Sequence, residues 1–241
     1  MQKYFINENI ELNKSFKIES SDQHHIEKVM RNKNGDQIIC VDLKHIQYLC
    51  LIENVQEGTI LPIEKLDINN ELDVEVTLVY ALPKGDKFEF VLQKACELGV
   101  HHIIPLSSKR CVVKLTKKLP RYQKILKEAS EQSGRNRIPS IEEVKTIKEL
   151  KPYLKDYNLV AYEETAKQHE HGELFHTLQQ LKAGDQLLII VGCEGGFDES
   201  EIQELNEMGV KCCSLGNRIL RSETAPLYLM SVIGYSRELI K

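Results

Sequence analysis

Two short segments near the C-terminal end of the chain carry residues suited to binding a small ligand. The first, GCEGGF at 192–197, contains three glycines, whose missing side chains allow backbone groups to approach a ligand closely. The second, SLGNRILRSETA at 214–225, turns at a glycine and offers Arg218 and Arg221 as charged hydrogen-bond donors. Each segment precedes a helical pattern and follows an apolar run. Because ligands of open parallel sheets collect where strands lead into helices, we expect the two segments to form opposite walls of one pocket.

The spacing of the glycines excludes the commonest phosphate-binding loops. GCEGG differs from the dinucleotide fingerprint G-x-G-x-x-G, and no Gly-Lys-Ser/Thr follows it as in a P-loop. Glu194 also stands among the glycines, where it would repel a pyrophosphate. A ligand of neutral or mixed charge, such as an adenosine, a sulfonium or an amino-acid group, fits better. Taken alone, the glycine cluster is explained about as well by a tight turn between a strand and a helix.

The C-terminal two thirds of the chain alternate between strand and helix patterns. Apolar runs at 74–82, 157–164 and 186–191 predict buried strands. Asp198 followed by Glu201 is a signature of a helix N-terminus. This alternation predicts an α/β fold, with a mostly parallel sheet and helices on both of its faces.

The N-terminal part of the chain is richer in strand patterns. Clusters of β-branched and apolar residues at 38–43, 45–55 and 59–66 predict short strands, and 23–30 predicts a short helix. The Asn34-Gly35 pair predicts the turn of a β-hairpin. Several short strands at close spacing favour a small β-barrel.

A polar stretch separates the two patterns. Residues 67–73, DINNELD, have the composition of a linker. We therefore expect two domains, a small β-barrel over 1–70 and an α/β domain over 74–241.

The composition is that of a soluble globular protein. Of the 241 residues, 41% are hydrophobic and 28% are charged. No apolar run approaches the roughly 18–20 residues of a membrane span, and the first residues lack the apolar core of a signal peptide. The seven cysteines include no C-x-x-C pair, which favours a reducing compartment, most simply the cytoplasm.

A local basic cluster stands against the overall acidic balance. The net charge of −4 argues against indiscriminate binding of nucleic acid. A basic segment in such a protein can mark a localised polyanion-binding surface, although a solvated helix face is the commoner explanation. The cluster, set against only Glu128 and Glu131, consists of Lys109, Arg110, Lys114, Lys117, Lys118, Arg121, Lys124, Lys127, Arg135 and Arg137.

The C-terminal segments resemble those of a known enzyme class. GCEGGF followed by SLGNRILRSETA is very similar to the signature of the SPOUT methyltransferases, whose deep trefoil knot binds S-adenosylmethionine. Within that class, the chain resembles the uridine-N3 methyltransferases of small-subunit (16S) ribosomal RNA. Motifs similar to theirs occur in the expected order: MQKYFI at the start, HHIEKVMR (24–31), KGDKFEFVLQKACELGV (84–100), SSKRCVVK (107–114) and EQSGRNRIP (131–139). Cys193 replaces the family's usual Pro and Met30 its usual Leu, and neither change removes a group that the chemistry needs.

The resemblance implies a fold and a cofactor. The fold would be a SPOUT-type parallel sheet with a C-terminal trefoil knot, preceded by a PUA-like RNA-binding β-barrel. The protein would be a homodimer, and the apolar C-terminal helix is consistent with burial against a partner. The residues implied to bind S-adenosylmethionine are Gly192, Glu194, Gly195, Gly196, Leu215, Gly216, Leu220, Thr224 and Ala225.

The implied reaction transfers a methyl group to N3 of a uridine, which must first lose its proton. Arg221, Arg218 and Arg135 are the candidates for orienting the base or the phosphate, because arginine offers fixed charged donors but is a poor base. The sequence does not identify the proton acceptor: Glu194 and Glu223 are candidates, but capping of a nearby helix or binding of the cofactor's amine explains them at least as well. The expected partner is 16S ribosomal RNA or the small ribosomal subunit, contacted through Arg31, Lys109, Arg110 and Arg137.

Cysteine and histidine are not assigned to the chemistry. Attack from N3 needs no covalent adduct with the enzyme, so Cys193 is interpreted as a small packing residue. The pairs His24-His25 and His101-His102, together with His169 and His171, lack zinc-ligand spacing, and no metal is predicted.

Three other functions stay open. The chain could be a related methyltransferase that acts on transfer RNA or on another ribosomal site. It could be a non-catalytic RNA-binding or assembly factor that has kept the fold. A nucleotide-dependent oxidoreductase is disfavoured by the glycine spacing.

Overall fold

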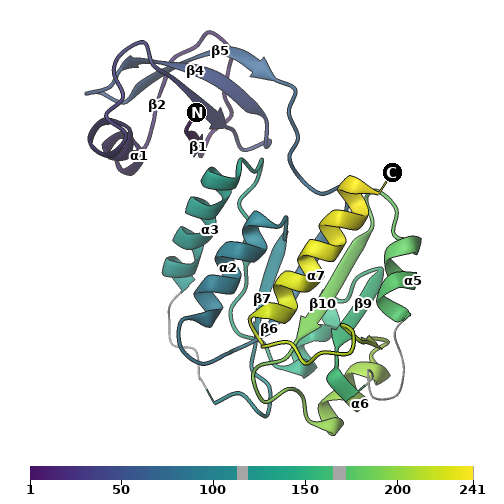
Figure 1. Cartoon of the computed structure of the whole chain (residues 1–241). Helices are drawn as coiled ribbons and strands as arrows, with labels where there is room; N and C mark the ends of the chain where they lie inside the picture. The colour runs from purple at the N-terminus through teal and green to yellow at the C-terminus, as the bar shows by residue number, and fades with distance from the viewer. Residues whose placement is uncertain (113–118, 165–171, 241) are drawn as a thin grey trace. The chain divides into compact units, whose positions relative to one another are not determined.

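The computed structural model describes residues 1–112, 119–164 and 172–240 (Figure 1). The chain divides into two compact units. One comprises Met1–Glu71 with Ser130–Arg137, and the other comprises Leu72–Ala129 with Ile138–Lys241. Of the residues discussed above, Lys114, Lys117, Lys118, His169 and His171 lie outside the described ranges.

The first unit is built on a five-stranded sheet with the order β1-β3-β4-β5-β2. β1 pairs in parallel with β3, and the other pairs are antiparallel. Fully buried side chains such as Ile38, Ile52 and Ile60 form its core, as expected for strands with one face turned inward. The elements are β1 (Lys3–Phe5), β2 (Phe16–Lys17), α1 (Ser20–His24), η1 (His25–Val29), β3 (Gln37–Val41), β4 (Gln47–Asn54) and β5 (Thr59–Leu66).

The segment Ser130–Arg137 completes this first unit, although it lies far along the chain. The Asn136 side chain donates hydrogen bonds to the carbonyl oxygens of His45 (3.0 Å) and Ile68 (2.8 Å). Its carbonyl oxygen accepts one from Gln47 Nε2 at 2.8 Å. Asn136 and Gln47 are both buried, so these bonds replace the water that the polar groups lose.

The second unit contains a six-stranded sheet in which every pairing is parallel, with the order β11-β9-β10-β6-β7-β8. Its central strands are apolar runs that are buried on both faces, as the predicted parallel sheet requires. The strands are β6 (Glu75–Ala81), β7 (His102–Leu106), β8 (Ser140–Ile141), β9 (Tyr157–Ala161), β10 (Gln186–Val191) and β11 (Lys211–Cys213).

Helices cover both faces of this sheet, as predicted (Figure 1). Alternate strand residues face two separate apolar clusters: Leu187 and Ile189 enter one, and Leu188 and Ile190 enter the other. The first cluster is closed by α2 (Lys87–Glu97), α3 (Leu119–Ser133), α5 (Glu173–Gln180) and α7 (Thr224–Gly234), and α7 continues into η3 (Tyr235–Leu239). The second is closed by η2 (Ile147–Tyr153) and α6 (Glu199–Glu207).

Two local predictions have different outcomes. The capping box at the start of α6 is confirmed: the Asp198 side chain accepts from the backbone of the first turn, and Glu201 reaches back to the Asp198 amide at 2.9 Å. The hairpin turn at Asn34-Gly35 is wrong, because this pair joins η1 to β3 rather than two paired strands. The Asn34 side chain instead accepts a hydrogen bond from the Val55 amide at 2.8 Å.

None of the helices in the described part of the chain combines the length and the apolar character that crossing a membrane requires.

Candidate functional site

A cavity of about 1060 Å³ lies in the second unit, where β9, β10 and β11 end. These three strands are neighbours in the sheet and run in parallel, so the loops that follow them leave from the same edge. The residues of these three loops that line the cavity fall in the ranges 162–164, 192–197 and 215–222, and Arg110 joins them from the turn after β7. Both segments singled out in the sequence therefore line the same cavity.

Eight of the nine residues predicted to bind the cofactor line this cavity; they are Gly192, Glu194, Gly195, Gly196, Leu215, Gly216, Leu220 and Ala225. The ninth, Thr224, is the exposed first residue of α7 and does not line it.

The glycine turn after β10 is held from the side by the turn that follows β7. Arg110 donates a hydrogen bond from its guanidinium to the carbonyl oxygen of Gly195 at 3.0 Å, and a Cβ at Gly195 would lie only 3.0 Å from Arg110 Cβ. Gly196 has φ = 66°, a conformation that costs little for glycine alone. Glycines are thus required here by a close approach at one position and by backbone conformation at the next.

Lys109 packs against the start of α6. Its amide donates to Glu201 Oε1 at 2.7 Å, and its ammonium donates to Ser200 Oγ at 2.5 Å. Lys109 and Arg110 were predicted to contact RNA. Both side chains stay at least about half exposed, at 62% and 49%, while they also hold the loops of the cavity.

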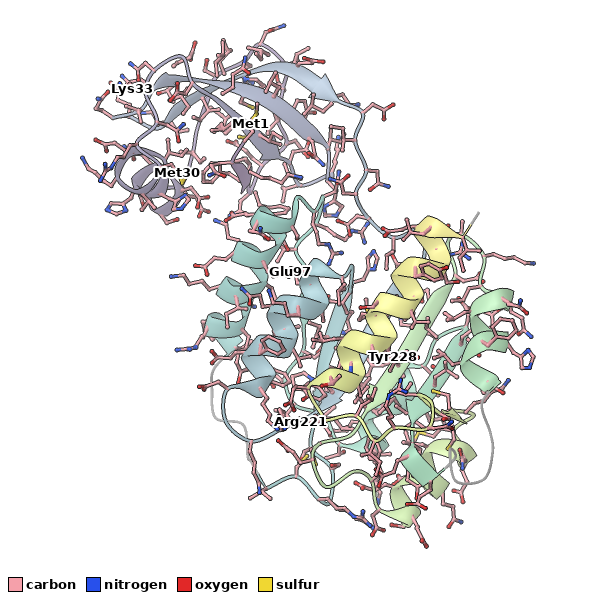
Figure 2. The ribbon with its side chains drawn as sticks, viewed as in Figure 1. Met1, Met30, Lys33, Glu97, Arg221 and Tyr228 are labelled. Atoms are coloured by element: carbon pink, nitrogen blue, oxygen red, sulfur yellow. The ribbon has the colours of Figure 1, made fainter. Side chains whose placement is uncertain are left out.

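The charged residues around the cavity are balanced. Four cations and four carboxylates line it: Lys87, Arg110, Arg218 and Arg221, and Glu163, Glu164, Glu194 and Glu199. Arg218 and Arg221 are exposed, and Figure 2 shows Arg221 on the loop that leads into α7. Within the ranges that the structure describes, neither guanidinium makes a hydrogen bond or an ion pair with a protein group. Both donors are therefore available to a ligand.

The chain is similar to known RNA-modifying proteins over its whole length. Residues 70–234 match the family model of an RNA methyltransferase domain, and residues 18–61 match that of an RNA methyltransferase PUA domain. The ribosomal RNA small subunit methyltransferase E of Bacillus subtilis is 42% identical over 253 aligned residues, which cover 100% of this chain and 99% of the relative. The protein of the same name from Mesomycoplasma hyopneumoniae is 35% identical, and the alignment covers 96% of this chain and 98% of that protein.

A solved structure agrees with these relatives. The crystal structure of a ribosomal RNA small subunit methyltransferase E from Neisseria gonorrhoeae, bound to S-adenosylmethionine, has a TM-score of 0.86 at 29% identity. The alignment covers 97% of this chain and 96% of that one. The chain belongs to the ribosomal RNA small subunit methyltransferase E family. As a member of this family, it is an RNA methyltransferase.

Lys87 of this methyltransferase also lines the cavity, although its sequence pattern did not mark it as a site residue. Its ammonium lies 2.9 Å from Glu194 Oε1 and 3.0 Å from Glu223 Oε2. The amide of Lys84 also donates to Glu194, at 3.2 Å. Burial alone would raise the pKa values of Glu194 and Glu223, but their hydrogen bonds, including those from Lys87, bring both below the usual value. The hydrogen bonds with Glu194 and Glu223 raise the pKa of Lys87 in turn, so all three groups are charged at neutral pH.

Cys193 fits the packing role predicted for it. Its side chain is buried. The pKa of Cys193 is raised well above the usual value, mainly by a hydrogen bond with the Cys111 side chain and to a smaller extent by burial. A thiol that stays protonated is a poor nucleophile. Among the described residues of this methyltransferase, no group of His, Cys, Asp and Glu side chains could hold a metal ion.

The remaining predicted site residues, Arg31, Arg135 and Arg137, belong to the first unit. Arg31 is exposed and adopts φ = 57°. Arg135 does not have the surroundings expected of a catalytic residue, because its guanidinium forms an ion pair with Glu71 and both side chains are nearly fully buried. The Glu71 carboxylate also accepts from the amides of Asn136 (2.8 Å) and Arg137 (3.2 Å). These contacts give Arg135 a structural partner, and its role in orienting the substrate stays a prediction.

Proposed function

We propose that the chain transfers the methyl group of S-adenosylmethionine to N3 of a uridine in the 16S RNA of the small ribosomal subunit. One observation carries the proposal: both glycine-containing segments line a single cavity, to which Arg218 and Arg221 contribute guanidinium groups that no protein group in the described ranges binds. Family membership supports the class of reaction, and we propose that it takes place in this cavity.

The cavity suits this cofactor in size and in charge. At about 1060 Å³ it is slightly larger than the roughly 300–1,000 Å³ of ordinary ligand pockets, which leaves room for a nucleotide beside a cofactor. S-adenosylmethionine carries a sulfonium, an amine and a carboxylate, and equal numbers of acidic and basic side chains line the cavity. When bound, it supplies the electrophilic methyl group.

The protein groups have separate tasks in this scheme. The backbone around Gly195 and Gly196 lies against the cofactor, and Arg110 fixes that turn through the Gly195 carbonyl. Arg221 and Arg218 orient the uridine and stabilise the negative charge that spreads onto its carbonyl oxygens. Glu194 and Glu223 have lowered pKa values and are paired with Lys87, so neither is proposed as the proton acceptor.

The two domains divide the work between RNA and cofactor. We assign residues 1–70 to a PUA-like RNA-binding domain and residues 74–241 to a SPOUT methyltransferase domain with a C-terminal trefoil knot. Arg31 and Arg137 of the first unit, with the exposed Lys109 and Arg110 of the second, are proposed to contact phosphates. The target uridine has to leave its stack to reach the cofactor, as in other enzymes that modify bases.

A homodimer in the cytoplasm is the assembly we propose. Apolar side chains are exposed on α7 and in the last residues of the chain: Tyr228 (39%), Tyr235 (57%), Leu239 (73%) and Ile240 (58%). Figure 2 shows Tyr228 on α7, the helix that follows the arginine loop. A second copy that covered these side chains would remove them from water. The cytoplasmic location follows from the proposed ribosomal substrate.

The experiment combines purified protein, labelled S-adenosylmethionine and small ribosomal subunits from cells that lack the activity, and maps the label by mass spectrometry. We expect a single 3-methyluridine in the small-subunit RNA. Gly195→Val, whose side chain would clash with Arg110, is the inactive control. Label in another RNA or at another position would leave the fold and cofactor in place but refute the substrate. Cofactor binding without any label would favour an assembly factor.

A further inference from the structure

Lys87 occupies a position in the cavity that links three separate parts of the chain. It is the first residue of α2, and it lines the cavity. Its two partners come from different connections: Glu194 lies in the turn after β10, and Glu223 directly precedes α7. The hydrogen-bonding geometry therefore ties the two cofactor loops to the start of α2.

The two carboxylates are close because one ammonium lies between them. With distances of 2.9 Å and 3.0 Å to the same nitrogen, the two oxygen atoms lie within about 6 Å of each other. Two carboxylates at such a separation repel each other unless a cation compensates. Lys87 therefore offsets the repulsion between the charges of Glu194 and Glu223.

Glu194 has a second contact with the segment at the start of α2. The backbone amide of Lys84, three residues before Lys87, donates to both oxygens of the Glu194 carboxylate, at 3.2 Å and 3.4 Å. The turn before α2 thus presents the Lys84 amide to the glycine turn, and the first residue of α2 presents the Lys87 ammonium. A rigid second contact of this kind holds a binding loop in one geometry.

We propose that Lys87 is a positioning residue of the cofactor site, which neutralises Glu194 and Glu223 and thereby holds the two loops of the cavity together. This inference rests on the proposed function, since it takes S-adenosylmethionine as the ligand of the cavity. Lys87 acts here through the two carboxylates. In the competing role, the ammonium binds the cofactor's carboxylate directly. The two roles predict different changes in cofactor affinity when the charge of Glu223 is removed.

The test measures the Kd of S-adenosylmethionine by calorimetry for the full-length parent and a set of variants. We expect Lys87→Met to weaken binding at least about tenfold and Lys87→Arg, which keeps the charge, to stay within about threefold of the parent. Adding Glu223→Gln to Lys87→Met should recover part of the lost affinity, because it removes one of the two repelling charges. Direct binding of the cofactor's carboxylate by Lys87 predicts no such recovery.

Lys94→Met is the matched control. Lys94 lies on the same helix, pairs with Glu97 at 2.8 Å and has nearly the same side-chain exposure, 36% against 35% for Lys87. Figure 2 shows Glu97 and Arg221 apart, with Glu97 at the end of α2 remote from the cavity loops. This variant should bind the cofactor with the affinity of the parent.

The outcomes separate this inference from the proposed function. Parental affinity in Lys87→Met, or a further loss on adding Glu223→Gln, overturns the positioning role while leaving the methyltransferase in place. A parent protein that binds no S-adenosylmethionine overturns the proposed function instead. Lys87→Gln, which keeps a hydrogen-bond donor but no charge, serves the same comparison should Lys87→Met fail to fold.

Discussion

The three arginines that were predicted to orient the substrate have opposite surroundings in the two units. Arg135 in the first unit is nearly fully buried and paired with Glu71. Arg218 and Arg221 in the second unit are exposed, and in the described ranges no protein group binds their guanidinium groups. The difference shows that an arginine's role follows from its burial and its partners. A paired, buried arginine stabilises the fold, and an unpaired one at a cavity is available to a ligand.

The largest effect that this comparison predicts is on stability. Arg135→Met removes one partner of the buried pair and leaves the Glu71 carboxylate without its cation. Breaking such a pair costs about 3–5 kcal/mol, and we expect a loss of that size in the free energy of unfolding measured with urea. Arg121→Met is the matched control, because Arg121 pairs with Glu89 at 2.6 Å but its side chain is 66% exposed. If Arg135→Met and Arg121→Met lower the free energy of unfolding by the same small amount, the contrast between the buried and the exposed pair is wrong.

The second prediction concerns catalysis. Arg221→Met removes a charged donor from the cavity, and we expect kcat/KM for methylation of small subunits to fall about 100-fold, since losing one stabilising donor typically costs about 10²–10³. The free energy of unfolding should change by less than about 0.5 kcal/mol, because the side chain is exposed and has no partner among the described residues. Rate assays and urea unfolding on the same preparation check both parts. If Arg221→Met lowers the free energy of unfolding but leaves kcat/KM unchanged, Arg221 has a structural role and not a catalytic one.

The third prediction separates fold from ligand binding within the second unit. Gly196 (φ = 66°) and Gly209 (φ = 88°) both adopt left-handed backbone conformations, and at either position an added Cβ would meet open space. An alanine at either position should cost roughly 1–2 kcal/mol of stability. Only Gly196→Ala should also weaken binding of S-adenosylmethionine, by about tenfold, because Gly209 does not line the cavity. Equal effects on the Kd would show that strain alone reduces binding.

Much of the second unit could be predicted from the sequence. Buried parallel strands are continuous apolar runs, so 74–82 and 186–191 predicted β6 and β10 to within about two residues. β8 and β11 are only two and three residues long, and so short a strand leaves no periodic pattern to detect. The helical signature at Asp198 and Glu201 was readable because both hydrogen bonds of the cap are local.

Contacts between distant parts of the chain were not predictable. Ser130–Arg137 joins the first unit through bonds to residues more than 60 positions away, such as Asn136 to Ile68 and Arg135 to Glu71. No periodicity or spacing marks such pairs, so the pairing of the buried Arg135 with Glu71 could not be predicted from the sequence. Lys87 was missed for the same reason: KGDK has the pattern of a turn and a helix start, and its two carboxylate partners are brought to it by the fold.

The smallest effect is expected from a change of pH. The pKa values of Glu194 and Glu223 lie below the ordinary 4.5 and that of Lys87 lies above the ordinary 10.5. A carboxylate with a lowered pKa keeps its charge down to that lower value, and a lysine with a raised pKa keeps its charge as the pH rises to the higher one. All three charges are therefore constant between about pH 5.5 and 7, below the range near 7.7–8.0 where an α-amino group such as the cofactor's titrates. Glu194, Glu223 and Lys87 should therefore change the Kd of S-adenosylmethionine by less than about twofold across that interval. A steeper change would point to Cys111, whose hydrogen bond with the cavity residue Cys193 lowers its pKa to about 6, and Cys111→Ser should then remove the pH dependence.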